Sequence, residues 1–191
     1  AVGVFSVATP YEAQARKTKP ETSTDITIKR APGQSVVMTM SEIGTIFQNR
    51  FPNAALHSVE LNSNDLAYAY KVTGYSKYHE YKMKIDIITG NQSDMSEGSK
   101  PKRVIGEIFN KDKVIEPSQA EAAAKAQLGA DAVMKGWKIE AHNGKVLYYV
   151  TMHQDGKKVV VTVDAETGAY VEQSKSYKLP PEPDQGFDGR K

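Results

Sequence analysis

Cysteine is absent from this sequence of 191 residues, which excludes disulfide bonds, thiol catalysis, cysteine-ligated zinc and iron–sulfur clusters. An excess of one charge is also missing, because 25 basic and 23 acidic residues leave a net charge of +2. That balance argues against a nucleic-acid-binding protein. No apolar run reaches the roughly 20 residues that a membrane-spanning helix needs. Among the aromatic residues Phe and Trp are few, whereas Tyr accounts for ten.

Groups that could support catalysis are missing as well. The four histidines do not stand at the spacing of a zinc motif, and no phosphate-binding glycine loop or nucleophile elbow is present. Catalysis requires activated groups held together in a cleft, and no such set can be nominated. We therefore predict that the protein is not an enzyme and has no catalytic residues, metal ligands or cofactor-binding residues.

The N-terminal end differs in composition from the rest of the chain. Residues 1–15 are apolar and small, and they end in Ala13-Gln14-Ala15, a triplet typical of signal-peptidase sites. We interpret them as a partial signal peptide, with an apolar N-terminal arm as the alternative. Residues 16–36 are rich in Lys, Thr and Pro and read as a polar tether. An extracytoplasmic protein, secreted or associated with the cell envelope, is the expectation.

The C-terminal end is predicted to be a disordered tail over residues 176–191. Apolar periodicity stops after Val171, and the segment Leu179 to Pro183 contains three prolines, which favour an extended polyproline conformation.

Two copies of one pattern occupy the middle of the chain. A shift of 78 positions superposes identical residues without a gap: Tyr70 on Tyr148, Val72 on Val150, Asp86 on Asp164, Thr89 on Thr167 and Gly90 on Gly168. Matched periodicity on every element supports the repeat. We place the first repeat at residues 37–95 and the second at 114–175, with a basic and apolar linker at 96–113.

Each repeat is predicted to consist of one helix followed by antiparallel strands. A helix is expected to begin at a serine, and in the second repeat Ser118 and Glu121 would form a capping box with Pro117 just outside. Alternating apolar residues then predict three strands, joined by turns such as His142-Asn143-Gly144 and Gln154-Asp155-Gly156. The fold class is α+β: two tandem repeats, each with one helix packed on a three- to four-stranded antiparallel sheet. Whether the repeats share one sheet is left open.

Both repeats close with the pattern Asp-x-x-Thr-Gly. It consists of Asp86, Thr89 and Gly90 in the first repeat and of Asp164, Thr167 and Gly168 in the second. We interpret it as a structural turn, in which glycine supplies a positive φ and the Asp and Thr side chains bind turn amides.

This order of elements, with its closing turn, resembles the PepSY domain. The second repeat is the better match, whereas in the first Ile43 and Phe47 stand where small residues are more usual. The resemblance implies an extracytoplasmic, non-catalytic module that inhibits or regulates a peptidase at the bacterial cell envelope. It transfers no functional residue, because the family has no catalytic set.

Two hypotheses for binding remain open. Three tyrosines around one hairpin, Tyr75, Tyr78 and Tyr81, would form a tip that contacts a protein partner such as a peptidase. Alternatively, a structural or ligand-binding envelope protein would contact an anionic wall polymer or a membrane surface through the linker. That contact would use Lys100, Lys102 and Arg103, with Lys111 and Lys113 nearby. The apolar linker residues Val104, Ile105, Ile108 and Phe109 are expected to pack across both repeats. The sequence does not determine the oligomeric state.

Overall fold

The computed structural model describes residues 38–62, 69–99 and 103–181. Several predicted features lie outside the described residues: the signal peptide or arm at 1–15, the tether at 16–36, Lys100, Lys102 and the last part of the C-terminal tail. No helix in the described part is long and apolar enough to cross a membrane.

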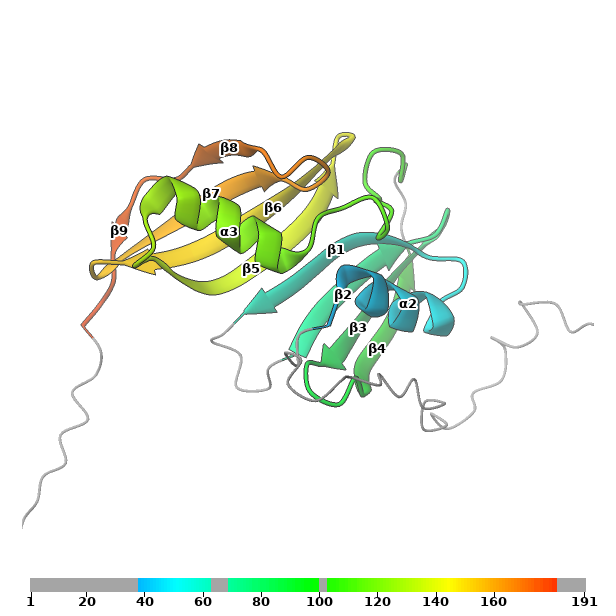
Figure 1. Cartoon of the computed structure of the whole chain (residues 1–191). Coiled ribbons are helices and arrows are strands. Elements are labelled where there is room, and N and C mark those ends of the chain that lie inside the picture. Colours follow the sequence, from blue (N-terminus) through cyan, green and yellow to red (C-terminus); the bar gives the residue numbers. More distant parts are fainter. Residues whose placement is uncertain (1–37, 63–68, 100–102, 182–191) are drawn as a thin grey trace, which may run out of the picture. The chain divides into compact units, whose positions relative to one another are not determined.

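In the described residues, the first repeat forms one helix followed by four strands, which Figure 1 labels. Its elements are α2 (Met40–Arg50), β1 (Ala55–Asn62), β2 (Ala69–Tyr75), β3 (His79–Asp86) and β4 (Gln92–Ser99). The second repeat follows the same plan with α3 (Pro117–Leu128), β5 (Val133–His142), β6 (Lys145–Gln154), β7 (Lys157–Asp164) and β8 (Tyr170–Gln173). A further short strand, β9 (Tyr177–Lys178), pairs with β7.

All of these strands belong to one antiparallel sheet. The strand order is β4-β3-β2-β1-β5-β6-β7-β8, so the first strand of each repeat lies at the centre. There β1 pairs with β5 from Ser58 opposite Glu140 to Asn62 opposite Gly136. The two repeats therefore form one continuous sheet, and we call the β1–β5 junction the seam.

Both helices cover the same face of the sheet. Val59 on β1 pairs with Val72 on β2 and with Ile139 on β5, and Ile139 pairs with Tyr148 on β6. These four side chains share one face and are at most 1% exposed. In Figure 1, α2 lies over the strands of its repeat and α3 over those of the second. The described helices and strands thus form two layers with an apolar interior between them.

An aromatic contact joins the interiors of the two repeats. Trp137, on β5, is 4% exposed. Its ring centroid lies 5.9 Å from that of Tyr70 in the first repeat and 6.0 Å from that of Tyr148 in the second. Burial of the Tyr148 side chain raises its pKa, and its hydroxyl donates a hydrogen bond to the carbonyl oxygen of Ile115 at 2.7 Å.

The beginnings of both helices differ from the prediction. Helix α2 is capped by Thr39, which forms a capping box with Glu42. The capping box predicted from Ser118 and Glu121 is wrong, because α3 begins at Pro117 with Glu116 as its N-cap. Proline suits the first helical position because its φ is already set and it has no N–H to satisfy.

Two predicted boundaries also need correction. Strand β4 extends to Ser99, so residues 96–99 belong to the sheet and not to a linker. The tail predicted from residue 176 is ordered at Tyr177 and Lys178, which pair with Lys158 and Lys157 of β7. Two residues are too few for a periodic pattern, which explains why the sequence did not reveal β9.

Candidate functional site

The face of the sheet that neither helix covers, here called the open face, is polar around the seam. Cross-strand pairing places Lys82, Thr73, Ser58 and Glu140 in one row and Lys84, Lys71, Glu60 and Lys138 in the next. The two-residue period that buries Val59 and Val72 is the same period that places these residues on the opposite face.

A shallow groove of about 330 Å³ lies in this surface beside the seam. Its lining combines four lysines with two carboxylates and several hydroxyls: Ser58, Glu60, Lys71, Val72, Thr73, Lys82, Met83, Lys84, Asp94, Ser96 and Lys138. The lining residues therefore carry an excess of positive charge. Ser58, which is 8% exposed, and Thr73 lie opposite each other on β1 and β2.

Carboxylates of the same protein bind three of the groove lysines. The Lys84 ammonium lies 3.1 Å from Asp94, the Lys82 ammonium lies 3.4 Å from Glu80, and the Lys138 ammonium lies 2.6 Å from Glu140. These pairs are partly exposed, so each contributes only about 0–1 kcal/mol. An incoming carboxylate could therefore exchange for an internal one at small cost.

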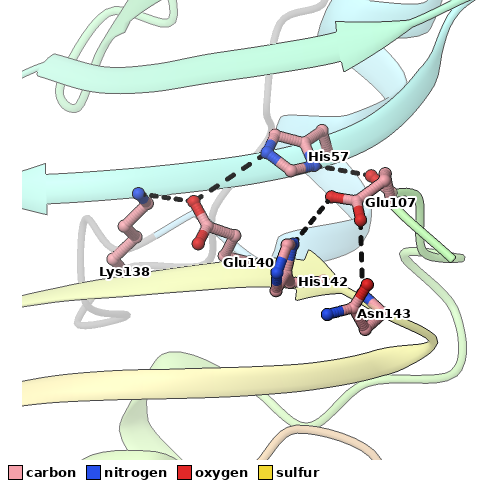
Figure 2. Close-up of polar contacts among 6 residues, drawn as sticks. All are labelled: His57, Glu107, Lys138, Glu140, His142 and Asn143. Carbon is pink, nitrogen blue, oxygen red and sulfur yellow. Dashed lines mark hydrogen bonds and ion pairs between the residues drawn. The ribbon is translucent and has the colours of Figure 1, made fainter. Parts of the chain in front are cut away.

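A cluster of polar side chains connects the repeats at one end of the seam (Figure 2). The carbonyl oxygen of Glu107 accepts a hydrogen bond from His57 Nδ1 at 2.6 Å, and the Glu107 carboxylate accepts one from His142 Nδ1 at 3.1 Å. The backbone N–H of Asn143 donates to the same carboxylate at 3.3 Å. Glu140 lies between Lys138 and the Nε2 atom of His57, at 2.6 and 3.8 Å. The cluster is thus continuous with the groove through Lys138.

The surroundings of this cluster shift the pKa values of Glu107 and Tyr75. The hydrogen bond from His142 holds the pKa of Glu107 below its usual value of 4.5, and the Asn143 amide acts in the same direction. Burial, followed by the charges of Glu80, Glu107 and Glu140, raises the pKa of Tyr75 to about 12. Tyr75 therefore remains a neutral phenol, and its ring lies 4.5 Å from that of His57.

The three tyrosines predicted to form a partner-binding tip do not lie together on the surface. Tyr78 is 64% exposed, whereas Tyr75 and Tyr81 are 8% and 4% exposed. Tyr81 lies on the helix-covered face, with its ring 4.8 Å from that of Phe51. The predicted tip is wrong for Tyr75 and Tyr81, because each packs against its own repeat.

The linker behaves only partly as predicted. Phe109 is buried, and its N–H donates to Leu56 in the first repeat, while Gly106 accepts a hydrogen bond from Gly144 in the second. In contrast, Ile105 and Ile108 are 79% and 38% exposed. The linker therefore contacts both repeats through its backbone, and Phe109 is buried, but the predicted packing across both repeats is wrong for the two exposed isoleucines.

Of the predicted basic contact, Arg103 is described and exposed. Lys111 is instead held by Asp112, with 2.9 Å between the ammonium and a carboxylate oxygen. Asp112 also accepts a hydrogen bond from Ser41 of the first repeat. The described part of the linker thus offers fewer unpaired cations than its composition implies.

The Asp-x-x-Thr-Gly turns have the geometry that the sequence predicts. Asp86 accepts hydrogen bonds from the amides of Ile88 and Thr89, and Asp164 accepts them from those of Glu166 and Thr167, all at 2.8–2.9 Å. Thr89 and Thr167 each accept one from the amide two residues on. Gly90 and Gly168 have φ values of 73° and 77°.

Acid is expected to weaken both turns. Backbone hydrogen bonds, those of Thr89 and Thr167 first, hold the pKa of Asp86 and Asp164 below the ordinary 3.8. The two ionised carboxylates therefore contribute fully to the free energy of unfolding above pH 3.8, and this contribution disappears as the pH falls below that value. We expect the double variant Asp86→Asn, Asp164→Asn to lose about 0.5–1 kcal/mol per turn at pH 7, a value that allows for solvent screening. Urea unfolding at pH 7 and pH 3 measures this, and an equal loss at both would contradict it.

Sequence reasoning missed the groove and the seam cluster. The only available signal was the recurrence of lysine at positions that alternate with the core residues, such as Lys82 and Lys84 beside Met83. In the described part of the chain no three His, Asp or Glu side chains are arranged to hold a metal ion.

Comparison with known proteins extends this description. The family model described as "Peptidase propeptide and YPEB domain", or PepSY, matches the chain twice, over residues 37–95 and 114–173. A crystal structure of a provisionally assigned lipoprotein from Clostridium difficile 630 shares 19% sequence identity with this chain and superposes with a TM-score of 0.66. The match covers 76% of this chain and 97% of that one, and at this identity it shows the fold alone. No curated protein sequence matches the chain.

Proposed function

Since this chain belongs to the PepSY family, we propose that it is a non-catalytic, extracytoplasmic binding module that regulates or inhibits a peptidase at the bacterial cell envelope. The family description connects such domains with peptidase propeptides. The lipoprotein of similar fold supports a location in the envelope. The open-face groove is the observation that carries the proposal of binding.

The charge of the groove indicates which part of a peptidase it would bind. The groove lysines are Lys71 on β2, Lys82 and Lys84 on β3, and Lys138 on β5, with β1 between β2 and β5. They outnumber the two carboxylates in the lining. An extended segment with Asp or Glu side chains could replace Glu80, Asp94 or Glu140 as the partner of these lysines. The hydroxyls of Ser58 and Thr73 provide hydrogen bonds at the same place. We therefore propose an acidic, extended segment of the peptidase as the occupant.

The experiment combines binding with inhibition. The full chain is used to capture proteins from the envelope fraction of the source cell, and each captured peptidase is purified and assayed with and without the chain. We expect saturable inhibition, weakened at least tenfold by Lys71→Glu with Lys84→Glu, because two attractive contacts become repulsive. The control, Lys175→Glu with Lys178→Glu, makes the same change of charge at exposed positions outside the groove.

Two results would contradict the proposal. Purified envelope peptidases that the chain neither binds nor inhibits would remove the peptidase function. Inhibition that the groove and control variants weaken equally would retain that function but remove the groove as its site. Salt-sensitive binding to wall polymer without peptidase binding would favour the alternative envelope function. We rank that alternative second, because the family description connects PepSY domains with peptidase propeptides.

A further inference from the structure

The seam has an internal symmetry that follows from the repeat. The offset of 78 makes Glu60 and Lys138 equivalent positions of the two repeats. The strand register places these same two residues opposite each other, with Val59 opposite Ile139 and Leu61 opposite Trp137 on either side. The strand order is symmetric about the same point, because β1 to β4 and β5 to β8 run outward from it. A local two-fold axis therefore passes between Glu60 and Lys138.

An interface with this symmetry is the kind that joins two copies of one subunit. In a two-fold interface every patch faces itself, and the residue on the axis meets its own copy. If two first repeats paired in this way, Glu60 would face Glu60. If two second repeats paired, Lys138 would face Lys138. Like charges directly opposite each other on neighbouring strands are destabilising.

We propose that the seam is an internal two-fold interface, made specific for unlike repeats by Glu60 and Lys138. The two residues on the axis carry opposite charges only when a first repeat pairs with a second. Pairing of the first repeat with the second repeat of the same chain is thereby favoured. Pairing of a first repeat with the first repeat of another copy, or of two second repeats, is disfavoured. This inference does not depend on the proposed peptidase function.

The surroundings of the pair strengthen this selection. Glu60 lies between Lys138 on β5 and Lys71 on β2, so a lysine at position 60 would face two cations. Lys138 lies opposite Glu60 in the strand register, and its ammonium lies 2.6 Å from Glu140, so a glutamate at position 138 would lie beside another carboxylate. On the opposite face of the seam, Val59, Ile139 and Trp137 are at most 4% exposed and carry no charge. Glu60 and Lys138 therefore distinguish unlike from like repeats, whereas the buried apolar residues stabilise the seam.

A charge-reversal cycle tests the proposal in the full chain. The variants are Glu60→Lys, Lys138→Glu and the two together, and urea unfolding gives each folding equilibrium constant. We expect each single reversal to lower the folding equilibrium constant about fivefold or more. The double reversal should lower it by a clearly smaller factor than the two single factors multiplied together. The control cycle reverses Lys71 and Glu172, which are far apart on the same open-face row. In this control the double variant should lower the folding equilibrium constant by the product of the two single factors.

A neutralised variant tests the selection between copies. Glu60→Gln with Lys138→Gln removes both charges from the axis but keeps two side chains of similar length. Refolded at high protein concentration, it should give a larger share of dimers and higher oligomers than the unchanged chain, measured by light scattering after size exclusion. Effects that show no coupling in the cycle would overturn the proposal, and so would a neutralised variant with the mass distribution of the unchanged chain.

Discussion

Replacing Trp137 by alanine is expected to lower the free energy of unfolding by about 3–5 kcal/mol, the usual cost of removing a buried large aromatic side chain. Trp137 is 4% exposed, and it contacts Tyr70 of one repeat and Tyr148 of the other. The substitution would therefore leave a cavity where the two interiors meet. A packed interior does not close such a cavity fully.

Urea unfolding followed by circular dichroism measures this loss. Fluorescence is unsuitable, because Trp137 is the only tryptophan in the chain. Trp137→Phe should lose clearly less, since it retains a ring between Tyr70 and Tyr148. Tyr78→Ala is the surface control, with an expected change within about 0.5 kcal/mol, because Tyr78 is 64% exposed. A loss below about 1 kcal/mol for Trp137→Ala would show that the two repeats do not share their interior.

The substitution Gly136→Ala, which adds one methyl group, should weaken the pairing of β1 with β5. A Cβ atom there would lie 2.8 Å from the backbone oxygen of Leu61 on the neighbouring strand, which cannot move without moving β1. We therefore expect Gly136→Ala to lower the free energy of unfolding by about 1–3 kcal/mol, as for other overpacked sites. Chemical denaturation at neutral pH measures the change.

The matched control for this substitution is Gly98→Ala. Gly98 also lies on a strand, β4, and a Cβ atom there would meet nothing within 4 Å. Its expected change is within about 0.5 kcal/mol. If the two variants lose the same free energy, the close approach of β1 and β5 at Gly136 does not limit the seam.

The tyrosines around the β2–β3 hairpin show how nearness in sequence misleads. Tyr75 and Tyr81 are six positions apart and lie on paired strands, yet they point to opposite faces of the sheet. Tyr81, Met83 and Ile85 are two residues apart on β3 and therefore lie on one face, and all three are buried. The alternation along β3 therefore already indicated that Tyr81 points into the interior. Only Tyr78, at the turn between the strands, is exposed. Alternation along each strand was therefore a better guide than clustering along the chain.

The seam cluster could not have been predicted in the same way. Its contacts join residues far apart in the sequence: His57 and Glu107 differ by 50 positions, and His142 and Glu107 differ by 35. No local pattern connects such residues. They meet only because β1 pairs with β5.

The sequence by itself determined the two repeats, the type of most elements and the closing turns. These depend on interactions between residues a few positions apart: apolar alternation, glycine at positive φ, and Asp and Thr side chains that bind nearby amides. Only the tertiary structure decided that the repeats share one sheet, which lysines form a groove and which tyrosines are buried. Those features depend on which strand edges pair, and that choice is made by contacts between residues that the chain keeps far apart.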